Sequence, residues 1–302
     1  MIAIARLADR SPTAAAAVAA SLLLAAFALF PVIGVLMVVP VTLSAATVAF
    51  VILRRGDRAA MRVGLICFAM LLGVSLVMLR SALAIPIAAL SSWLPPVAAA
   101  LVLARTASLP LATLAALVLG MVAVVAFALA TGDPVAWWTA EIERMLGALA
   151  ETGQTGLDVE AVSAAIGPVA YWMTGAVGVS ITVSALLALF IARHWQAVIE
   201  NPGGFGREFR ALSLGNAAAL ATLALVAAAA ILGGTVLTGL AIVACSGFVL
   251  QGLAVLHALV AQRGLPAFWL WAIYALLVMV PYLWPLLLAL GLLDNRVPLR
   301  RA

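Results

Sequence analysis

The sequence is poor in charge, and it contains no lysine. Only 9% of its 302 residues are charged, whereas 67% are hydrophobic. So little polar surface excludes the soluble globular classes and indicates a polytopic membrane protein. The sixteen basic residues are all arginine and lie in short turns between apolar runs. The net charge of +5 therefore does not indicate nucleic-acid binding.

Paired cysteines, intramembrane acids and catalytic motifs are also missing. Cys67 and Cys245 lie singly in apolar runs, without metal or redox spacing, so we interpret both as small packing residues. The chain has no phosphate loop, zinc helix motif, serine-hydrolase elbow or dinucleotide fingerprint. None of the eleven carboxylates lies in the middle of an apolar run, which argues against a proton-driven pump. We expect no enzyme activity, no metal site and no cofactor.

The sequence does contain apolar runs of the length that crosses a bilayer, about 20 residues. Nine are found, at 13–30, 32–53, 60–79, 82–104, 109–130, 167–192, 211–232, 236–261 and 266–292. We predict an all-α fold, a polytopic transmembrane helical bundle of about eight to nine spans in a single membrane domain, 1–302. The first run is interpreted as an uncleaved span. Prolines predict kinks in the fourth and ninth runs, at Pro86, Pro95, Pro96, Pro281 and Pro285.

The arginines predict the orientation. With a cytoplasmic N-terminus and nine alternating spans, eleven arginines lie inside and five outside, which favours this orientation. The outer five are Arg80, Arg144, Arg296, Arg300 and Arg301. Three of these belong to the C-terminal tail, which would prefer the cytoplasm; either one span after residue 211 is miscounted or the tail is an exception. We expect a multi-pass protein of a bacterial inner membrane.

The longest polar connection, 131–167, is predicted to be an extracytoplasmic amphipathic cap. Asp133-Pro134 is typical of a helix N-cap with proline in the first turn. The apolar stripe that follows comprises Val135, Trp138, Ile142, Met145, Leu146 and Leu149. A helix of this kind lies in the interface plane. A turn at 153–156 and a second short helix near Asp158 follow. The segment is either an interfacial cap or a lid over a ligand pocket.

The segment 193–212, a predicted cytoplasmic turn, combines arginine, aromatic and glycine residues. Asn201-Pro202-Gly203-Gly204 predicts a turn, because proline restricts one dihedral and glycine accepts positive φ. The candidate contacts to lipid or a partner are Arg193, Trp195, Asn201, Pro202, Gly203, Gly204, Phe205, Arg207, Glu208, Phe209 and Arg210. Three interpretations stay open: a hinge with aromatic anchors at the headgroups, a docking loop, and an anion or nucleotide site.

Few polar residues lie within the spans. Hydroxyl groups there usually bond to their own backbone or to a neighbouring helix. Gln251 and His257 are larger and form a possible intramembrane polar site, although a spacing of six does not put them quite on one face. A lipid-modifying enzyme would need His194 or His257 as a base, and neither has an evident acid or metal partner in the sequence.

The stretch Arg193-His194-Trp195-Gln196-Ala197, with Asn201-Pro202-Gly203-Gly204-Phe205 and Glu208-Phe209, resembles the signature of the YybS-like family of bacterial integral membrane proteins. Further echoes are Gln251-Gly252-Leu253-Ala254 and Gly291-Leu292-Leu293-Asp294. The tail departs from the family pattern at Arg296, Pro298 and Leu299. The membrane domain of that family is similar to the substrate-binding components of energy-coupling-factor vitamin transporters. Those components pack helices around a small-molecule pocket and dock through small-residue faces onto an energy-coupling partner.

Two functions follow from these features. The resemblance implies a non-enzymatic small-molecule binding or transport component, with a vitamin- or cofactor-like ligand under the cap and docking by the alanine-rich first span. The alternative is a membrane scaffold or assembly protein that works through 193–212 without a ligand. The expected partners are the lipid bilayer and an energy-coupling or other membrane protein, not nucleic acid.

Overall fold

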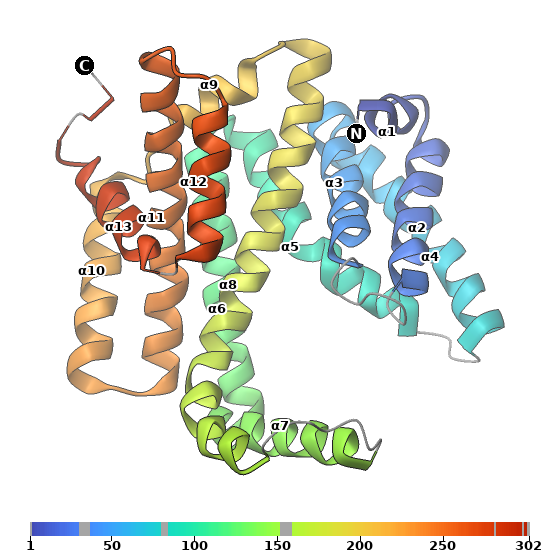
Figure 1. The fold of residues 1–302 in the computed structure, drawn as a ribbon. Coiled ribbons are helices and arrows are strands. Elements are labelled where there is room, and N and C mark those ends of the chain that lie inside the picture. The colour runs from blue at the N-terminus through green and yellow to red at the C-terminus, as the bar shows by residue number, and fades with distance from the viewer. Residues whose placement is uncertain are drawn as a thin grey trace. The chain divides into compact units, whose positions relative to one another are not determined.

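The computed structural model describes residues 2–29, 37–79, 84–151, 159–280, 282–297 and 299–300. Within these ranges the secondary structure is helical, without strands (Figure 1). The predicted all-α class is therefore confirmed. The chain forms two compact units, Met1–Ala116 with Thr182–Leu212, and Leu117–Ile181 with Ser213–Ala302.

Unit 1 packs its helices around α3. Its elements are α1 (Ile2–Ala8), α2 (Pro12–Leu29), α3 (Val38–Arg55), α4 (Asp57–Leu79), α5 (Ala84–Thr106), the start of α6 (Leu109–Thr131), the end of α8 (Val159–Glu200), and α9 (Gly204–Arg210). Residues 44–52 of α3 are all buried, because α2, α4 and α5 contact this helix. Ser44 donates to the Ala19 carbonyl at 2.7 Å and accepts from Trp93 Nε1 at 3.1 Å, so this hydroxyl joins helices as predicted.

The alanines of α2 are used inside unit 1. Ala16 and Ala20 are fully buried, and α2 contacts both α3 and α4. Cys67, also fully buried, donates to the Ala16 carbonyl at 3.2 Å and is a packing residue, as predicted. The expectation that the first span presents its small residues to a partner is wrong at these positions, because neighbouring helices of the same chain already cover them.

Unit 2 is built on α11. It contains α7 (Pro134–Glu151), α10 (Gly215–Leu232), α11 (Thr235–Gln262), α12 (Phe268–Met279) and α13 (Leu283–Leu293), with the remaining parts of α6 and α8. The helices α11 and α13 pack closely at Gly252 and Gly291, where a Cβ would overlap the carbonyl oxygens of Leu287 and Phe248. Small residues allow backbones to approach in this way. In Figure 1, α10 and α11 form an antiparallel pair.

Seven described helices are long and apolar enough to cross a membrane: α3, α4, α5, α6, α8, α10 and α11. Three more apolar helices, α2, α12 and α13, are shorter in their described residues. The chain is thus a multi-pass membrane protein. The connection 30–36 between the first two predicted spans lies outside the described residues.

The predicted proline kinks have three different outcomes. Pro86 and Pro285 are the third residues of α5 and α13, where the missing N–H has no partner to lose. The helix α5 continues through Pro95 and Pro96. Pro281 lies outside the described residues, but Val280 before it is extended, with φ −125° and ψ 88°, as expected for a residue that precedes proline.

The ninth predicted span is not one helix, because it divides into α12 and α13 on either side of Val280. Trp284 Nε1 donates to the Leu277 carbonyl at 3.2 Å, so a side chain satisfies part of the open end of α12. After α13 the chain returns to the C-terminal end of α11, where Gln262 Nε2 donates to the Arg300 carbonyl at 2.6 Å. The tail therefore lies beside the C-terminal end of α11, which favours the alternative of a miscounted span after residue 211 over an exceptional tail.

The cap begins as predicted. Asp133 Oδ1 accepts from the backbone N–H groups of Val135 at 2.9 Å and Ala136 at 3.1 Å, which caps α7. Figure 1 shows α7 running crosswise to α6 and α8. The predicted turn at 153–156 and Asp158 lie outside the described residues. The expected second short helix is wrong, because the helix that begins at Val159 continues to Glu200.

Candidate functional site

The segment 193–212 is an ordered corner between α8 and α9. The helix α8 ends at Glu200, and the Asn201 carbonyl accepts from Gly204 N at 2.8 Å. Gly203 has φ +80°, a conformation that residues with a Cβ rarely adopt, so the predicted turn is confirmed and depends on this glycine. Asn201, Pro202 and Gly203 are exposed, whereas Gly204 is buried against the Asn201 side chain.

An arginine fork and an aromatic cluster attach α9 to α8. Arg193 Nε donates to Glu208 Oε2 at 2.9 Å, and Arg193 Nη2 donates to Glu208 Oε1. The rings of Phe205 and Phe209 each lie 5.6 Å from the ring of Phe190. Bidentate arginine–carboxylate pairs impose an orientation as well as attraction. The helix α9 and the end of α8 are thus held in one relative orientation.

The prediction that Trp195 contacts lipid or a partner is wrong. Trp195 is fully buried, with its ring edge-on to Phe50 at 6.0 Å, so it cannot anchor a headgroup. The reason is its helix face: the buried residues Ala188 and Ala192 precede it at helical spacing, so Trp195 lies on the face of α8 that packs inside unit 1. Its Nε1 has no hydrogen-bond partner among the described residues. The apolar stripe before Trp195 is the sequence signal that could have identified this burial.

The remaining charged candidates lie at the surface of the corner. Arg207 is exposed and donates to Asn201 Oδ1 at 3.1 Å, while Arg210 is half-buried. Next to Arg193, Gln196 bridges to another helix, since its Nε2 donates to the Leu53 carbonyl at 3.1 Å. The corner is therefore joined to the end of α3.

An ion network at the same end of unit 1 was not predicted. Arg54 donates to Asp9 Oδ1 and Oδ2 at 3.3 and 3.0 Å and to Glu200 Oε1 at 2.5 Å. Arg55 also contacts Asp9. The network joins the α1–α2 turn, the end of α3 and the end of α8. No local pattern could indicate it, because Arg54 is separated from its partners by 45 and 146 residues.

Arginine outnumbers acid at this end of unit 1. The four acids there, Asp9, Asp57, Glu200 and Glu208, each pair with an arginine. Ten arginines belong to the same turns and helix ends, namely Arg6, Arg10, Arg54, Arg55, Arg58, Arg62, Arg105, Arg193, Arg207 and Arg210. The excess positive charge makes this end electrostatically suited to anionic partners.

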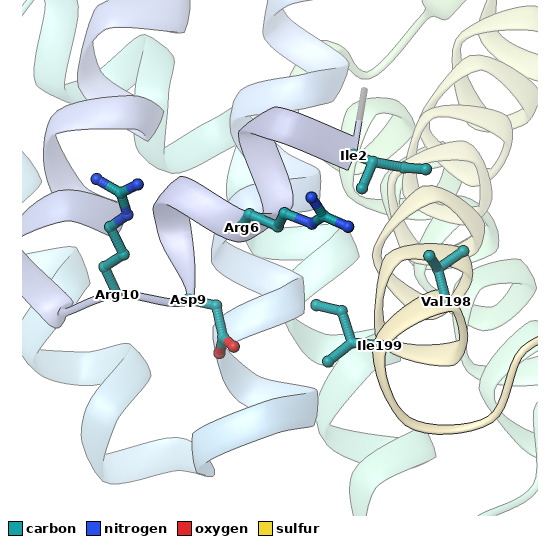
Figure 2. Close-up of a pocket in the computed structure, with 6 residues that line it drawn as sticks. All are labelled: Ile2, Arg6, Asp9, Arg10, Val198 and Ile199. Carbon is teal, nitrogen blue, oxygen red and sulfur yellow. The ribbon is translucent and has the colours of Figure 1, made fainter.

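A cavity opens beside this network between α1 and the last turn of α8 (Figure 2). Its volume is about 410 Å³, and its walls are Ile2, Arg6, Asp9, Arg10, Val198 and Ile199. A second, more open hollow of about 600 Å³ is lined by Ile2, Ala3, Arg6, Leu7 and Arg10. Figure 2 shows the Arg6 side chain extending toward α8, whereas the Asp9 carboxylate points away from the Arg6 guanidinium.

The two predicted intramembrane polar residues, Gln251 and His257, are not brought together. Gln251 is fully buried, accepts from Leu214 N at 2.9 Å, and donates to Asp294 Oδ2 at 3.0 Å. His257 Nδ1 lies 2.9 Å from the Leu253 carbonyl, and its Nε2 lies 3.3 Å from the Tyr274 hydroxyl. These two polar residues face different neighbours, α13 and α12.

Gln251 belongs instead to a cluster at the end of α13. Asp294 is almost fully buried and pairs with Arg300, whose Nε donates to its Oδ1 at 2.9 Å. Asn295 accepts from Gln251 Nε2 at 3.2 Å and from the Ser213 hydroxyl at 3.1 Å. The cluster joins the tail to α11 and to the segment before α10. We call this group of hydrogen-bonded residues the clasp and interpret its role as structural.

Within the described residues, no group of three histidine, cysteine or acidic side chains is arranged to hold a metal ion. His194 is exposed and packs edge-on against Phe205, with 6.3 Å between ring centroids. Comparison of the chain with protein families, curated proteins and solved structures finds no match.

Proposed function

We propose that this protein is a non-enzymatic scaffold or assembly component of a bacterial inner membrane, which docks a partner protein through the corner Arg193–Leu212. The observation that carries this proposal is the Arg193–Glu208 fork, which together with the phenylalanine cluster holds α9 on α8. A fixed corner presents its exposed residues without an ordering cost at each encounter. Arg207 and the turn 201–203 form its outer surface.

The arginine distribution supports a cytoplasmic position for this corner. The tail returns to the end of α11, so Arg296, Arg300 and Arg301 count with Arg263. Only Arg80 and Arg144 of the sixteen arginines in the sequence then belong to outer segments. The difference in arginine number between the two sides is larger than the one expected from nine simple spans, and it favours a cytoplasmic N-terminus.

The small-molecule hypothesis receives less support from the geometry. It requires a ligand under the cap, yet α7 is hydrogen-bonded to α8 there, since Trp138 Nε1 donates to Thr174 Oγ1 at 3.0 Å. The ring of Trp138 also stacks on Phe127 at 5.3 Å. These contacts favour an interfacial cap over a mobile lid. The likeness to the YybS-like family is compatible with either function.

Photo-crosslinking in cells tests the docking proposal. A photoreactive amino acid at position 207 is expected to give one discrete protein adduct, while the same residue at the exposed Met145 of α7 gives a different pattern. A Gly203→Val substitution should abolish the adduct, because valine does not tolerate φ +80°. The matched control is Gly206→Val, where a Cβ meets only the flexible end of Arg210.

Arg193→Lys provides a second test of the fixed corner. Lysine keeps the charge but cannot form the fork with Glu208 and Gln196 at once. The adduct should weaken, whereas Arg58→Lys on an exposed part of α4 should leave it unchanged. An adduct from position 207 that persists in both Gly203→Val and Arg193→Lys would contradict docking through an ordered corner.

A further inference from the structure

The cavity between α1 and α8 combines free positive charge with apolar walls. Arg6 and Arg10 are both exposed, and neither has an acidic partner among the described residues. The third charged lining residue, Asp9, is already held by Arg54 through both carboxylate oxygens. Its negative charge is thereby offset, so the cavity keeps a net positive potential.

The apolar part of the cavity comes from two helices. Ile2 of α1 is 42% exposed, and Ile199 of α8 is 37% exposed. Val198 completes this wall. The volume of about 410 Å³ lies in the range typical of pockets for small organic ligands, so more than a bare phosphate could fit.

The helix α1 lies beside two candidate membrane spans, α3 and α8. Ala5 and Ala8 are buried against unit 1, whereas Ile2 and Leu7 are each 42% exposed. An apolar exposed rim beside arginines is the pattern of an interfacial helix. The ends of α3 and α8, which the ion network joins to the α1–α2 turn, are ends of predicted membrane spans.

We propose that this cavity is a binding site for the headgroup of an anionic phospholipid. The phosphate lies against the Arg6 guanidinium, with Arg10 at the rim, and the glycerol and first methylene groups lie along Ile2, Val198 and Ile199. Arginine matches phosphate oxygens in charge and geometry. This site shares Val198 and Ile199 with the corner Arg193–Leu212 but not the exposed turn 201–203 or Arg207. It goes beyond docking, because it does not require a protein partner.

Titration of purified protein with lipid in a non-ionic detergent tests this site. Short-chain phosphatidylglycerol should raise the unfolding temperature in a saturable manner, and phosphatidylcholine of the same chain length should not. Arg6→Gln should weaken the apparent Kd about fivefold, as expected for one arginine at a lipid surface. Without lipid its unfolding temperature should equal that of the wild type, because Arg6 has no described partner to lose.

Two further variants separate this site from general surface charge. Ile199→Glu adds a carboxylate to the wall and should abolish the lipid effect without removing an arginine. Arg58→Gln removes an exposed arginine at the same end of unit 1, outside the cavity, and should leave the apparent Kd unchanged.

Inorganic phosphate distinguishes the source of the anion. It should produce no shift at the concentrations at which phosphatidylglycerol saturates, because it lacks the groups that contact the apolar wall. An equal shift with phosphate would overturn the assignment to a lipid. Equal weakening by Arg6→Gln and Arg58→Gln, or an equal response to both lipids, would overturn the site itself.

Discussion

Gly291 of α13 and Phe248 of α11 are in backbone contact, since a Cβ at position 291 would overlap the Phe248 carbonyl oxygen. Gly252 repeats this relationship in reverse, with the Leu287 carbonyl as its neighbour. The two glycines thus form a reciprocal seam. A backbone carbonyl cannot move aside as a flexible side chain can, so both positions require glycine.

Alanine at position 291 is expected to separate α13 from α11. Overpacking in a well-packed interior costs about 1–3 kcal/mol, and a backbone overlap belongs at the upper end. The unfolding temperature in detergent should fall clearly. Gly64→Ala in α4 is the matched control, because nothing lies within 4 Å of a Cβ there. Equal effects of the two substitutions would contradict the seam.

Replacing Gln251 by leucine should destabilise the clasp at the end of α13. The Leu214 N–H and the Asp294 carboxylate each lose a partner in a buried environment. Such losses cost about 1–3 kcal/mol for each group. On the same helix, Ser246→Ala removes a hydroxyl that bonds only within α11 and should change stability little. Thermal unfolding of both proteins checks this expectation, and a stable Gln251→Leu protein would refute it.

The tail and the α11–α12 turn should lie on one side of the membrane. Single cysteines at Leu265 and Val297, both exposed, should react with an impermeant maleimide from the same face. A cysteine at Glu143 in the cap should react from the opposite face. Cys67 and Cys245 are replaced by alanine beforehand. Labelling of position 297 together with position 143 would show that α12 and α13 cross the bilayer as one span.

Trp138 and Thr174 should be energetically coupled. Trp138→Phe removes the hydrogen bond at 3.0 Å and preserves an aromatic ring on Phe127, while Thr174→Val removes the acceptor. A hydrogen bond of this kind contributes about 1 kcal/mol. A double-mutant cycle in thermal stability should therefore give a coupling of that size. Strict additivity of the two changes would mean that the bond does not hold α7.

The helices themselves could be predicted because their signals are local. Apolar runs of spanning length identify α3 to α6, α8, α10 and α11, and Asp133 with the following proline marks the start of α7. The turn at Gly203 could also be predicted, since asparagine, proline and glycine each favour turn conformations. Predictions succeeded where one short stretch of sequence determined the outcome.

The candidate site depends on contacts between distant segments, which a single sequence does not report. The pairing of Arg54 with Asp9 and Glu200 is of this kind, as is that of Gln251 with Asp294. Trp195 was placed at the headgroups because tryptophan prefers interfaces, but it lies on the buried face of α8 together with Ala188 and Ala192. The division of the ninth span was missed because kinked and broken helices share the same proline signal.

The break between α12 and α13 bears on how the chain is inserted during synthesis. With 12 and 11 residues, these helices are about 18 and 17 Å long, well short of ~30 Å of hydrocarbon. Neither can leave the translocation channel alone as a stable span. We expect them to partition together, with α13 packed on Gly252 of α11. Cotranslational insertion is therefore expected to place α11 in the membrane before α12 and α13.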